Sequence, residues 1–290
     1  MEYHTKGHSA LERFDRQAGN ASWWTGQTMS YDWREPIADE KFSADWFQES
    51  DARFLHAARL FTGAPNPFVE LMDIESLAGK KVLEIGCGMG FHTEMLARAG
   101  ADLVSIDISP TSVEATRRRL AVHNLKARVE QCDAERINDL IPPGSIDLVW
   151  SWGVIHHSAH TARIIRNIGE ILKPDGRAKI MVYHLGGMSA YYTLLRRYVL
   201  GFWRGAQIDD LLNKDADGFT ARFYTREAFT DIALAFFRKA QVRVFGQDAD
   251  VLMLPRQARR PFLSLWSRKN QMEAAARRGS MLYLEASEPF

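Results

Sequence analysis

The chain has 290 residues, of which 46% are hydrophobic and 25% are charged, and its formal net charge is +1. This composition is ordinary for a soluble globular protein that buries one large core, or one domain with substantial additions. A net charge close to zero gives no overall attraction to nucleic acid or to anionic membranes, so we expect neither as a partner.

The two cysteines, Cys87 and Cys132, cannot form a disulfide framework, and they fit a reducing cytosol best. Residues 1–17 lack the apolar core of a signal peptide. No uninterrupted apolar run approaches the roughly 20 residues of a membrane-spanning helix. We therefore expect a cytoplasmic protein. The histidines have no cysteine or carboxylate partners at ligand spacing, so no metal site is expected.

Residues 1–78 differ from the rest of the chain, and we expect them to form a helical, aromatic-rich N-terminal arm. Hydrophobic residues recur at helical spacings over residues 44–61, which predicts a helix there. The aromatic side chains either anchor this arm to the core or belong to a lid that walls a substrate pocket. If the arm is a lid, the substrate-binding side chains are Trp24, Tyr31 and Trp33.

From residue 79 to residue 290, strand and helix patterns alternate, which predicts an α/β domain with a largely parallel sheet and helices on both faces. The seven expected strands are Lys81–Ile85, Leu103–Asp107, Ala127–Cys132, Ile146–Trp150, Ala178–Tyr183, Gln241–Phe245 and Met281–Ala286. The expected helices are Phe91–Ala99, Ser112–Asn124, Thr161–Leu172 and one from an N-cap at Thr225 to Lys239.

Two further stretches do not belong to this alternation. A helical insertion is expected at about residues 185–225, and residues 188–203 within it are apolar nearly all round. We favour a helix packed on the open end of the sheet, or a homodimer contact, over a helix lying on a membrane surface. Residues 256–278 are rich in arginine and contain one acid, Glu273. A solvated basic helix face is the simpler interpretation, and a nucleic-acid or phosphate patch is the alternative.

The glycines at Gly86, Gly88 and Gly90 follow a short apolar run and precede a helix. A strand, glycine turn and helix suit a nucleotide-like ligand, because glycine permits close backbone approach and the helix N-terminus offers unpaired N–H groups. The spacing is not the G-x-G-x-x-G of dinucleotide-binding loops. An acid, Glu84, lies inside the strand two residues before the first glycine.

Acidic residues also stand at the ends of the next two expected strands. Asp107 can accept hydrogen bonds from both hydroxyls of a ribose, and the adjacent Ile108 can pack under an adenine. Asp133 can accept a hydrogen bond from an adenine amino group. The carboxyl ends of neighbouring parallel strands share one edge of a sheet, so these groups should meet the glycine loop in one pocket.

The run Glu84-Ile85-Gly86-Cys87-Gly88-Met89-Gly90 resembles motif I (E-x-G-x-G-x-G) of class I S-adenosylmethionine-dependent methyltransferases. The resemblance extends from about residue 77 to residue 183 and includes a Leu-Lys-Pro-Asp-Gly turn at 172–176. It implies a Rossmann-like sheet of seven strands and S-adenosylmethionine as cofactor. The expected cofactor-binding residues are Glu84, Gly86, Cys87, Gly88, Asp107, Ile108, Asp133, Ala134, Ser151, Trp152 and Gly153.

Catalysis is expected near the fourth strand, which His156 and His157 follow. An imidazole could remove a proton from the methyl acceptor, with His156 slightly favoured, although packing or cofactor support is equally compatible with the pair. Arg222 and Tyr224 are expected to bind a substrate carboxylate; a structural ion pair of Arg222 is the alternative. We expect methylation of O, N or S on a small, carboxylate-bearing metabolite; a tRNA or protein methyltransferase and a non-catalytic cofactor-binding protein are the alternatives.

Overall fold

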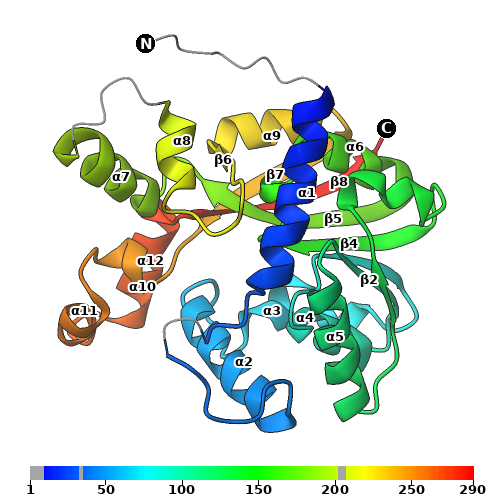
Figure 1. Ribbon diagram of the computed structural model, residues 1–290, viewed down its shortest axis with the longest axis horizontal. Coiled ribbons are helices and arrows are strands. Elements are labelled where there is room, and N and C mark those ends of the chain that lie inside the picture. The colour runs from blue at the N-terminus through cyan, green and yellow to red at the C-terminus, as the bar shows by residue number, and fades with distance from the viewer. Residues whose placement is uncertain (1–9, 33–34, 202–206) are drawn as a thin grey trace.

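A twisted sheet runs through the molecule, with helices packed on both of its faces (Figure 1). The computed structural model describes residues 10–32, 35–201 and 207–290. The strand order is β3-β2-β1-β4-β5-β8-β7, and a short strand, β6, pairs with β5. The strands are β1 (Lys81–Ile85), β2 (Asp102–Asp107), β3 (Arg128–Gln131), β4 (Ile146–Trp152), β5 (Leu172–His184), β6 (Phe223–Tyr224), β7 (Phe237–Phe245) and β8 (Met281–Pro289).

The first five strands are parallel, whereas β8 runs antiparallel to β5 and to β7. Ile85, the last residue of β1, lies opposite Ile106 of β2 and Ser151 of β4. The segments that follow these strands therefore leave the sheet side by side. The register thus brings the glycine loop, the Asp107 turn and the segment after β4 to one edge, as the sequence predicted.

The helical segments before residue 124 are α1 (Ala10–Gly26), α2 (Ala44–Ala58), α3 (Pro67–Leu71), a 3₁₀ turn (Ile74–Ser76), α4 (Phe91–Arg98) and α5 (Pro110–Val122). Those between β3 and β5 are two 3₁₀ turns (Ala134–Asp139 and Ile155–His157) and α6 (Thr161–Ile171). The later ones are α7 (Met188–Leu194), a π-helix (Leu195–Leu200), α8 (Ile208–Asn213), α9 (Arg226–Leu234), α10 (Asp248–Val251), α11 (Arg256–Leu263) and α12 (Arg268–Arg278).

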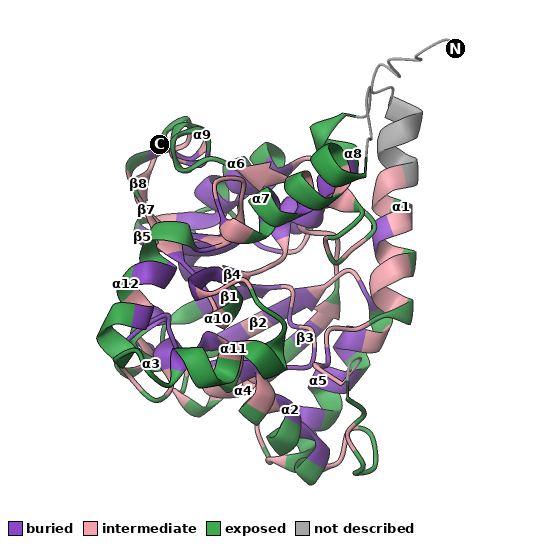
Figure 2. Ribbon diagram, turned by 90° about the vertical axis from the view of Figure 1, so that its left-hand side faces the viewer, coloured by how far each residue is buried: buried purple, intermediate pink, exposed green. Residues whose placement is uncertain are grey.

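Two apolar clusters bury the two faces of the sheet, and Figure 2 shows the buried residues along the strands. On one face, Ile164 and Phe229 from α6 and α9 pack with aliphatic strand residues. The other face is aromatic, with Phe54 and Phe68 from α2 and α3 packed against Trp150 of β4. The stacked Trp150 and Trp152 rings, whose centroids lie 5.5 Å apart, extend this aromatic face to the end of β4.

The α/β class, the seven main strands and the helices on both faces are confirmed, with two corrections. The two-residue strand β6 was not predicted. The helix that begins after the Thr225 N-cap ends at Leu234 and not at Lys239, because the chain from Phe237 pairs with β8 instead. Residues 185–225 hold α7, the π-helix, α8 and β6. Within the described residues, no helix is long and apolar enough to cross a membrane.

Candidate active site

A cavity of about 1200 Å³ opens over the carboxyl ends of the central strands. Of the expected cofactor-binding residues, it is lined by Gly86, Cys87, Gly88, Asp107, Ile108, Asp133, Ala134, Trp152 and Gly153. These residues lie at or just after the carboxyl ends of β1, β2, β3 and β4, so the adjacent parallel strands bring them together. The cavity therefore unites the glycine loop with both carboxylates that the sequence singled out.

All three glycines of the loop have positive φ, and the first two shape its approach to the cavity. Gly86 has φ +85°, and a Cβ there would lie 2.1 Å from Val154. Gly88 has φ +54°, and a Cβ there would stand in open space. The first glycine is thus required for packing against the segment after β4. The second leaves bare backbone beside the cavity, which suits close approach of a ligand.

Asp107 is held by backbone N–H groups on both of its carboxylate oxygens. Gly88 N–H donates to Oδ2 at 3.0 Å, and Ser109 N–H donates to Oδ1 at 2.9 Å. Burial raises the pKa of Asp107 to about 6, while these hydrogen bonds oppose the rise. The carboxylate therefore stays ionised at neutral pH and is fixed before any ligand arrives.

Asp133 is fixed in a similar way, partly by the N-terminal helix. Its Oδ1 accepts hydrogen bonds from Glu135 N–H at 2.9 Å and from Gln17 Nε2 at 2.7 Å. Burial raises the pKa of Asp133. Because Gln17 belongs to α1, this helix is connected directly to the part of the cavity assigned to the adenine.

Glu84 and Ser151 do not line the cavity but lie beneath it. Thr93 Oγ1 donates to Glu84 Oε2 at 2.5 Å, and Ser105 Oγ donates to the same oxygen at 2.7 Å. Burial raises the pKa of Glu84 to about 7. The carboxyl group thus joins β1, β2 and the first turn of α4 under the glycine loop. Ser151 is fully buried, and its hydroxyl has no partner among the described residues.

The two histidines occupy different environments. His157 lines the cavity, and its Nδ1–H donates to the Thr220 carbonyl at 2.7 Å when the ring is neutral. Burial lowers the pKa of His157 to about 4, so the ring is neutral near pH 7 and Nε2 carries the lone pair. Nε2 has no hydrogen-bond partner among the described residues. His157 therefore lines the cavity with a neutral ring whose unprotonated nitrogen is itself buried in the cavity wall.

His156 packs inside the protein and does not line the cavity. It is fully buried, neither ring nitrogen has a partner among the described residues, and its ring centroid lies 4.0 Å from that of Tyr183. Burial lowers its pKa well below the usual value. The geometry thus reverses the order of preference that the sequence suggested for the two histidines.

Aromatic side chains also line the cavity. Trp24 lies edge-on to His157, with ring centroids 5.0 Å apart, and Tyr31 packs on Phe54 at 5.2 Å. All four side chains line the cavity. The third expected substrate-binding aromatic, Trp33, lies outside the described residues. The described wall therefore joins α1, α2 and the segment after β4 around one apolar chamber.

A family model described as a methyltransferase domain matches residues 82–176, which include the glycine loop, Asp107, Asp133 and both histidines. The chain carries a class I S-adenosylmethionine-dependent methyltransferase domain. A ubiquinone biosynthesis O-methyltransferase from Nitrosococcus oceani is 30% identical over 132 residues, which cover 46% of this chain and 53% of that protein. The chain thus spans about half the length of this curated relative.

Two solved methyltransferase structures share the fold of this domain. A geranyl diphosphate C-methyltransferase from Streptomyces coelicolor A3(2) has a TM-score of 0.54 at 15% identity, with 94% of this chain and 97% of that chain covered. A phosphoethanolamine N-methyltransferase from Haemonchus contortus has a TM-score of 0.54 at 19% identity, with 88% and 61% covered. At these identities the likeness shows the fold alone.

The methyltransferase cavity has the features that S-adenosylmethionine requires. The bare backbone at Gly88 leaves room for the methionine part, and the fixed Asp107 carboxylate can accept ribose hydroxyls. Asp133 and Ala134 stand where the adenine is expected, although Gln17 already donates to one oxygen of Asp133. Among the described residues, no group of three or more histidine, cysteine or acidic side chains could hold a metal ion.

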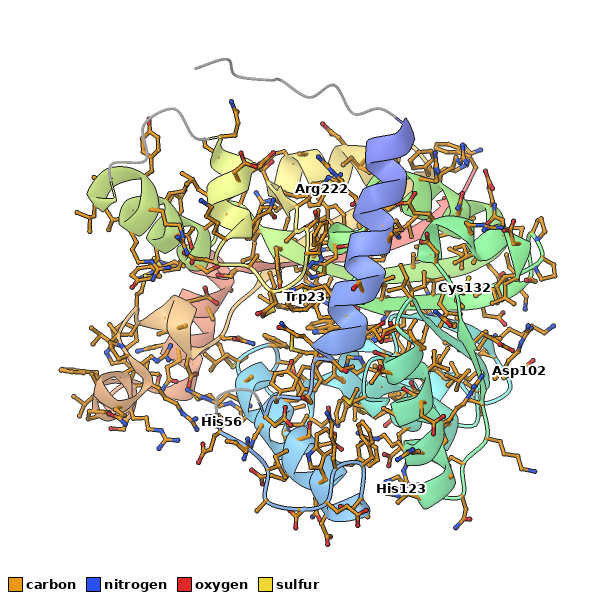
Figure 3. The ribbon with its side chains drawn as sticks, viewed as in Figure 1. Trp23, His56, Asp102, His123, Cys132 and Arg222 are labelled. Atoms are coloured by element: carbon orange, nitrogen blue, oxygen red, sulfur yellow. The ribbon has the colours of Figure 1, made fainter. Side chains whose placement is uncertain are left out.

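Arg222 and Tyr224 lie outside the cavity lining. The Arg222 guanidinium donates to the backbone carbonyls of Ser158 and Ala159, the second at 2.7 Å. Figure 3 labels Arg222 to the left of α1. Tyr224 packs on Phe229, with ring centroids 5.4 Å apart. The described contacts of Arg222 hold the chain after the histidines; they do not direct the guanidinium to a substrate.

Residues of α1 line the cavity or contact its wall, although no helix was predicted there from the sequence. Asn20 Nδ2 donates to the His157 carbonyl at 2.6 Å, and Gln17 Oε1 accepts from Ala159 N–H at 3.1 Å. With Trp24, these side chains lie at positions i, i+3 and i+7 of one helix, and therefore on one face. This helical spacing was the only signal of the site in the sequence of α1. Two of the three side chains are polar, so the spacing does not stand out as the apolar face of a helix would.

Proposed function

We propose that the protein transfers a methyl group from S-adenosylmethionine to a hydroxyl oxygen of a small molecule. The observation that carries this proposal is that one cavity joins the cofactor-binding residues to an aromatic chamber lined by His157, whose neutral ring carries an unprotonated Nε2. The similarity to ubiquinone biosynthesis O-methyltransferases supports the choice of oxygen as the acceptor atom.

When bound, S-adenosylmethionine supplies an electrophilic methyl group attached to a positively charged sulfur. In the proposed reaction the acceptor oxygen forms the new C–O bond, the S–C electron pair stays on sulfur, and the hydroxyl proton passes to His157 Nε2. A hydroxyl oxygen that gains a methyl group without losing its proton becomes an oxonium ion, which is far more acidic than an imidazolium. A histidine whose pKa is about 4 can therefore accept that proton.

The chamber assists by position and by exclusion of water. The Thr220 carbonyl fixes the tautomer of His157, and the Trp24 ring packs on its imidazole. Apolar rings such as Phe54 keep water from competing as a nucleophile. A thioether acceptor has no proton to lose and would leave His157 without a role, which is why we favour a hydroxyl.

The first test measures transfer of radiolabelled methyl groups from S-adenosylmethionine to a panel of phenols, alcohols, amines and thioethers. We expect hydroxyl acceptors to be methylated. His157→Ala should lower kcat by about 100-fold or more, the usual contribution of a general base, and leave cofactor affinity unchanged. The matched control is His123→Ala, because His123 directly follows α5 and does not line the cavity; Figure 3 labels it near the lower end of α5. Transfer only to amines or thioethers, or full activity of His157→Ala, would contradict the proposal.

A further inference from the structure

The cavity continues well beyond the glycine loop. Its far part is bordered by α7, α8, α10 and α11, and it includes Arg256, Arg259 and Arg260 from α11. Ligand sites for drug-sized molecules usually have volumes of about 300–1000 Å³. A cavity of about 1200 Å³ therefore has room for the cofactor and for a second molecule of substantial size. The arginines of α11 stand at the end of this second space.

Arg256 and Arg260 are one helical turn apart, so their side chains share one face of α11. Both are exposed and both line the cavity. Within the described parts of the chain, no carboxylate lies within ion-pair distance of either guanidinium. Burial raises the pKa of Asp250, and the positive charge of the third arginine, Arg259, opposes that rise. Two cations of this face are thus available to a ligand.

The acids at this end of the cavity already have partners. Arg59 forms an ion pair with Asp248 at 2.7 Å. Asp250 accepts hydrogen bonds from Ser280 Oγ and from Gln247 N–H, the second at 2.8 Å. Because these carboxylates are engaged within the protein, they leave the charge of Arg256 and Arg260 uncompensated.

Aromatic and aliphatic side chains contribute to the lining of the cavity near α11, beside polar ones such as Gln247 and Gln271. Phe61 and Trp152 line this part, and their ring centroids lie 5.4 Å apart. Met281 and Leu263 add aliphatic surface. A molecule that reaches from the glycine loop to α11 therefore meets aromatic and aliphatic surface along its body and guanidinium groups at its end.

We propose that Arg256 and Arg260 form an anion-binding subsite, and that the methyl acceptor carries a carboxylate or phosphate separated by an apolar body from the atom that is methylated. This inference rests on the proposed function, since it describes the acceptor of that reaction. A guanidinium offers several N–H donors in a planar fork, which matches the oxygens of both anions. The sequence predicted that Arg222 binds a carboxylate of the substrate. We now assign the binding of that acidic group to Arg256 and Arg260 instead.

The test uses binding, so that it does not depend on methyl transfer. The full chain, saturated with S-adenosylhomocysteine, is titrated in a calorimeter with 1-naphthyl phosphate, 1-naphthoate and the uncharged 1-naphthol. We expect at least one anion to bind about tenfold or more tightly than 1-naphthol, and more weakly as salt concentration rises. The two anions distinguish a phosphate subsite from a carboxylate subsite.

The variant Arg256→Ala/Arg260→Ala should lose about tenfold or more of the affinity for the preferred anion and keep its affinity for 1-naphthol. Arg277→Ala/Arg278→Ala is the matched control, because it removes the same charge from α12 without altering the cavity lining. Arg256→Lys/Arg260→Lys should retain part of the anion affinity through charge alone.

Three results would overturn the inference: no binding of either anion to the unaltered protein, unchanged anion affinity in Arg256→Ala/Arg260→Ala, or an equal loss in the α12 control. Circular dichroism spectra that match the unaltered protein would show that the variants fold. If anion binding depends on these arginines while no acceptor is ever methylated, the proposed function fails and the subsite stands. If hydroxyl acceptors are methylated but their binding does not depend on these arginines, the subsite fails and the proposed function stands.

Discussion

At the scale of single residues, Asp107 is the side chain that we expect to hold the ribose of the cofactor. Its two oxygens are aligned by Gly88 N–H and Ser109 N–H, so no reorganisation is needed when ribose hydroxyls replace water. We expect Asp107→Ala to weaken binding of S-adenosylhomocysteine by at least tenfold, because a charged hydrogen-bond acceptor contributes about 1.5–3 kcal/mol. Isothermal titration calorimetry measures this change. Asp102→Ala, at the opposite and exposed end of β2, is the control and should leave affinity unaltered. Equal affinity in the two variants would refute the assignment.

Glu84 should make the stability of the protein depend on pH. Burial raises its folded-state pKa to about 7, whereas an exposed glutamate titrates near 4.3. Between these values the folded protein binds a proton that the unfolded chain has lost, so the free energy of unfolding falls as pH rises from about 4.3 to 7. Above pH 7 the full loss of stability is present, on the order of 3–4 kcal/mol for a pKa that rises from about 4.3 to about 7.

The comparison of the unaltered protein with Glu84→Gln isolates this effect. Glutamine keeps the shape of the side chain and can hydrogen-bond to the hydroxyls of Thr93 and Ser105, but it does not titrate. Urea unfolding at pH 5, 6, 7 and 8 should show the variant gaining stability relative to the unaltered protein as pH rises. A difference between the two proteins that is constant with pH would contradict the raised pKa.

At the scale of elements, the segment between α8 and β6 holds His157 in place. Thr220 accepts its Nδ1–H, and a Cβ at Gly218 would lie 2.6 Å from the same nitrogen. Gly218 also has φ +97°, which side chains rarely adopt. We expect Gly218→Ala to displace this segment from His157 and to lower kcat several-fold while cofactor affinity is kept.

Gly144→Ala is the matched control for this prediction. Gly144 also has positive φ, at +59°, but nothing lies within 4 Å of its Cβ position, and it does not line the cavity. Both substitutions should lower thermal stability by backbone strain. Only Gly218→Ala should alter kcat and the pH dependence of the rate. Loss of activity in both variants, in proportion to stability, would show that the contact with His157 has no part in catalysis.

The elements that the sequence predicted best are those whose signal is local. The strand β1 was predicted with its observed bounds, because an apolar run ends abruptly at Gly86. The end of α9 was not, because Phe229, Ala233 and Phe237 continue a helical spacing. The pairing of Phe237 with Pro289 of β8 decides in favour of a strand, and a contact so distant in sequence leaves no local trace.

The candidate site shows the same division. The glycine loop and the two acids could be placed in advance because each follows a strand, and parallel strands bring their carboxyl ends together. The arginines could not be placed in this way. A guanidinium on a long, flexible side chain can reach many partners, and the sequence does not say which one it contacts. Arg222 donates to backbone carbonyls, whereas Arg256, assigned to a solvated face, lines the cavity.

At the scale of the whole molecule, α7 and the π-helix after it present an apolar surface to solvent. Leu195 is 52% exposed, Tyr198 is 50% exposed and Leu200 is 66% exposed. Figure 2 shows the exposed faces of these helices on the side turned to the viewer. Contiguous apolar surface of this kind commonly marks a protein contact. We retain the prediction that the protein is a homodimer, and we assign the contact to this surface, where a twofold axis would pair it with its own copy.

The assignment links association to the cavity, because the opposite face of α7 contributes Ala190 and Thr193 to the cavity lining. A dimer contact would steady that wall, so specific activity should fall on dilution below the dimer dissociation constant. In sedimentation equilibrium, Leu195→Glu/Leu200→Glu should be a monomer, whereas Val122→Glu, at an exposed site on α5, should behave as the unaltered protein does. The assignment is wrong if the unaltered protein is a monomer at the highest concentrations reached. It is also wrong if Leu195→Glu/Leu200→Glu remains a dimer.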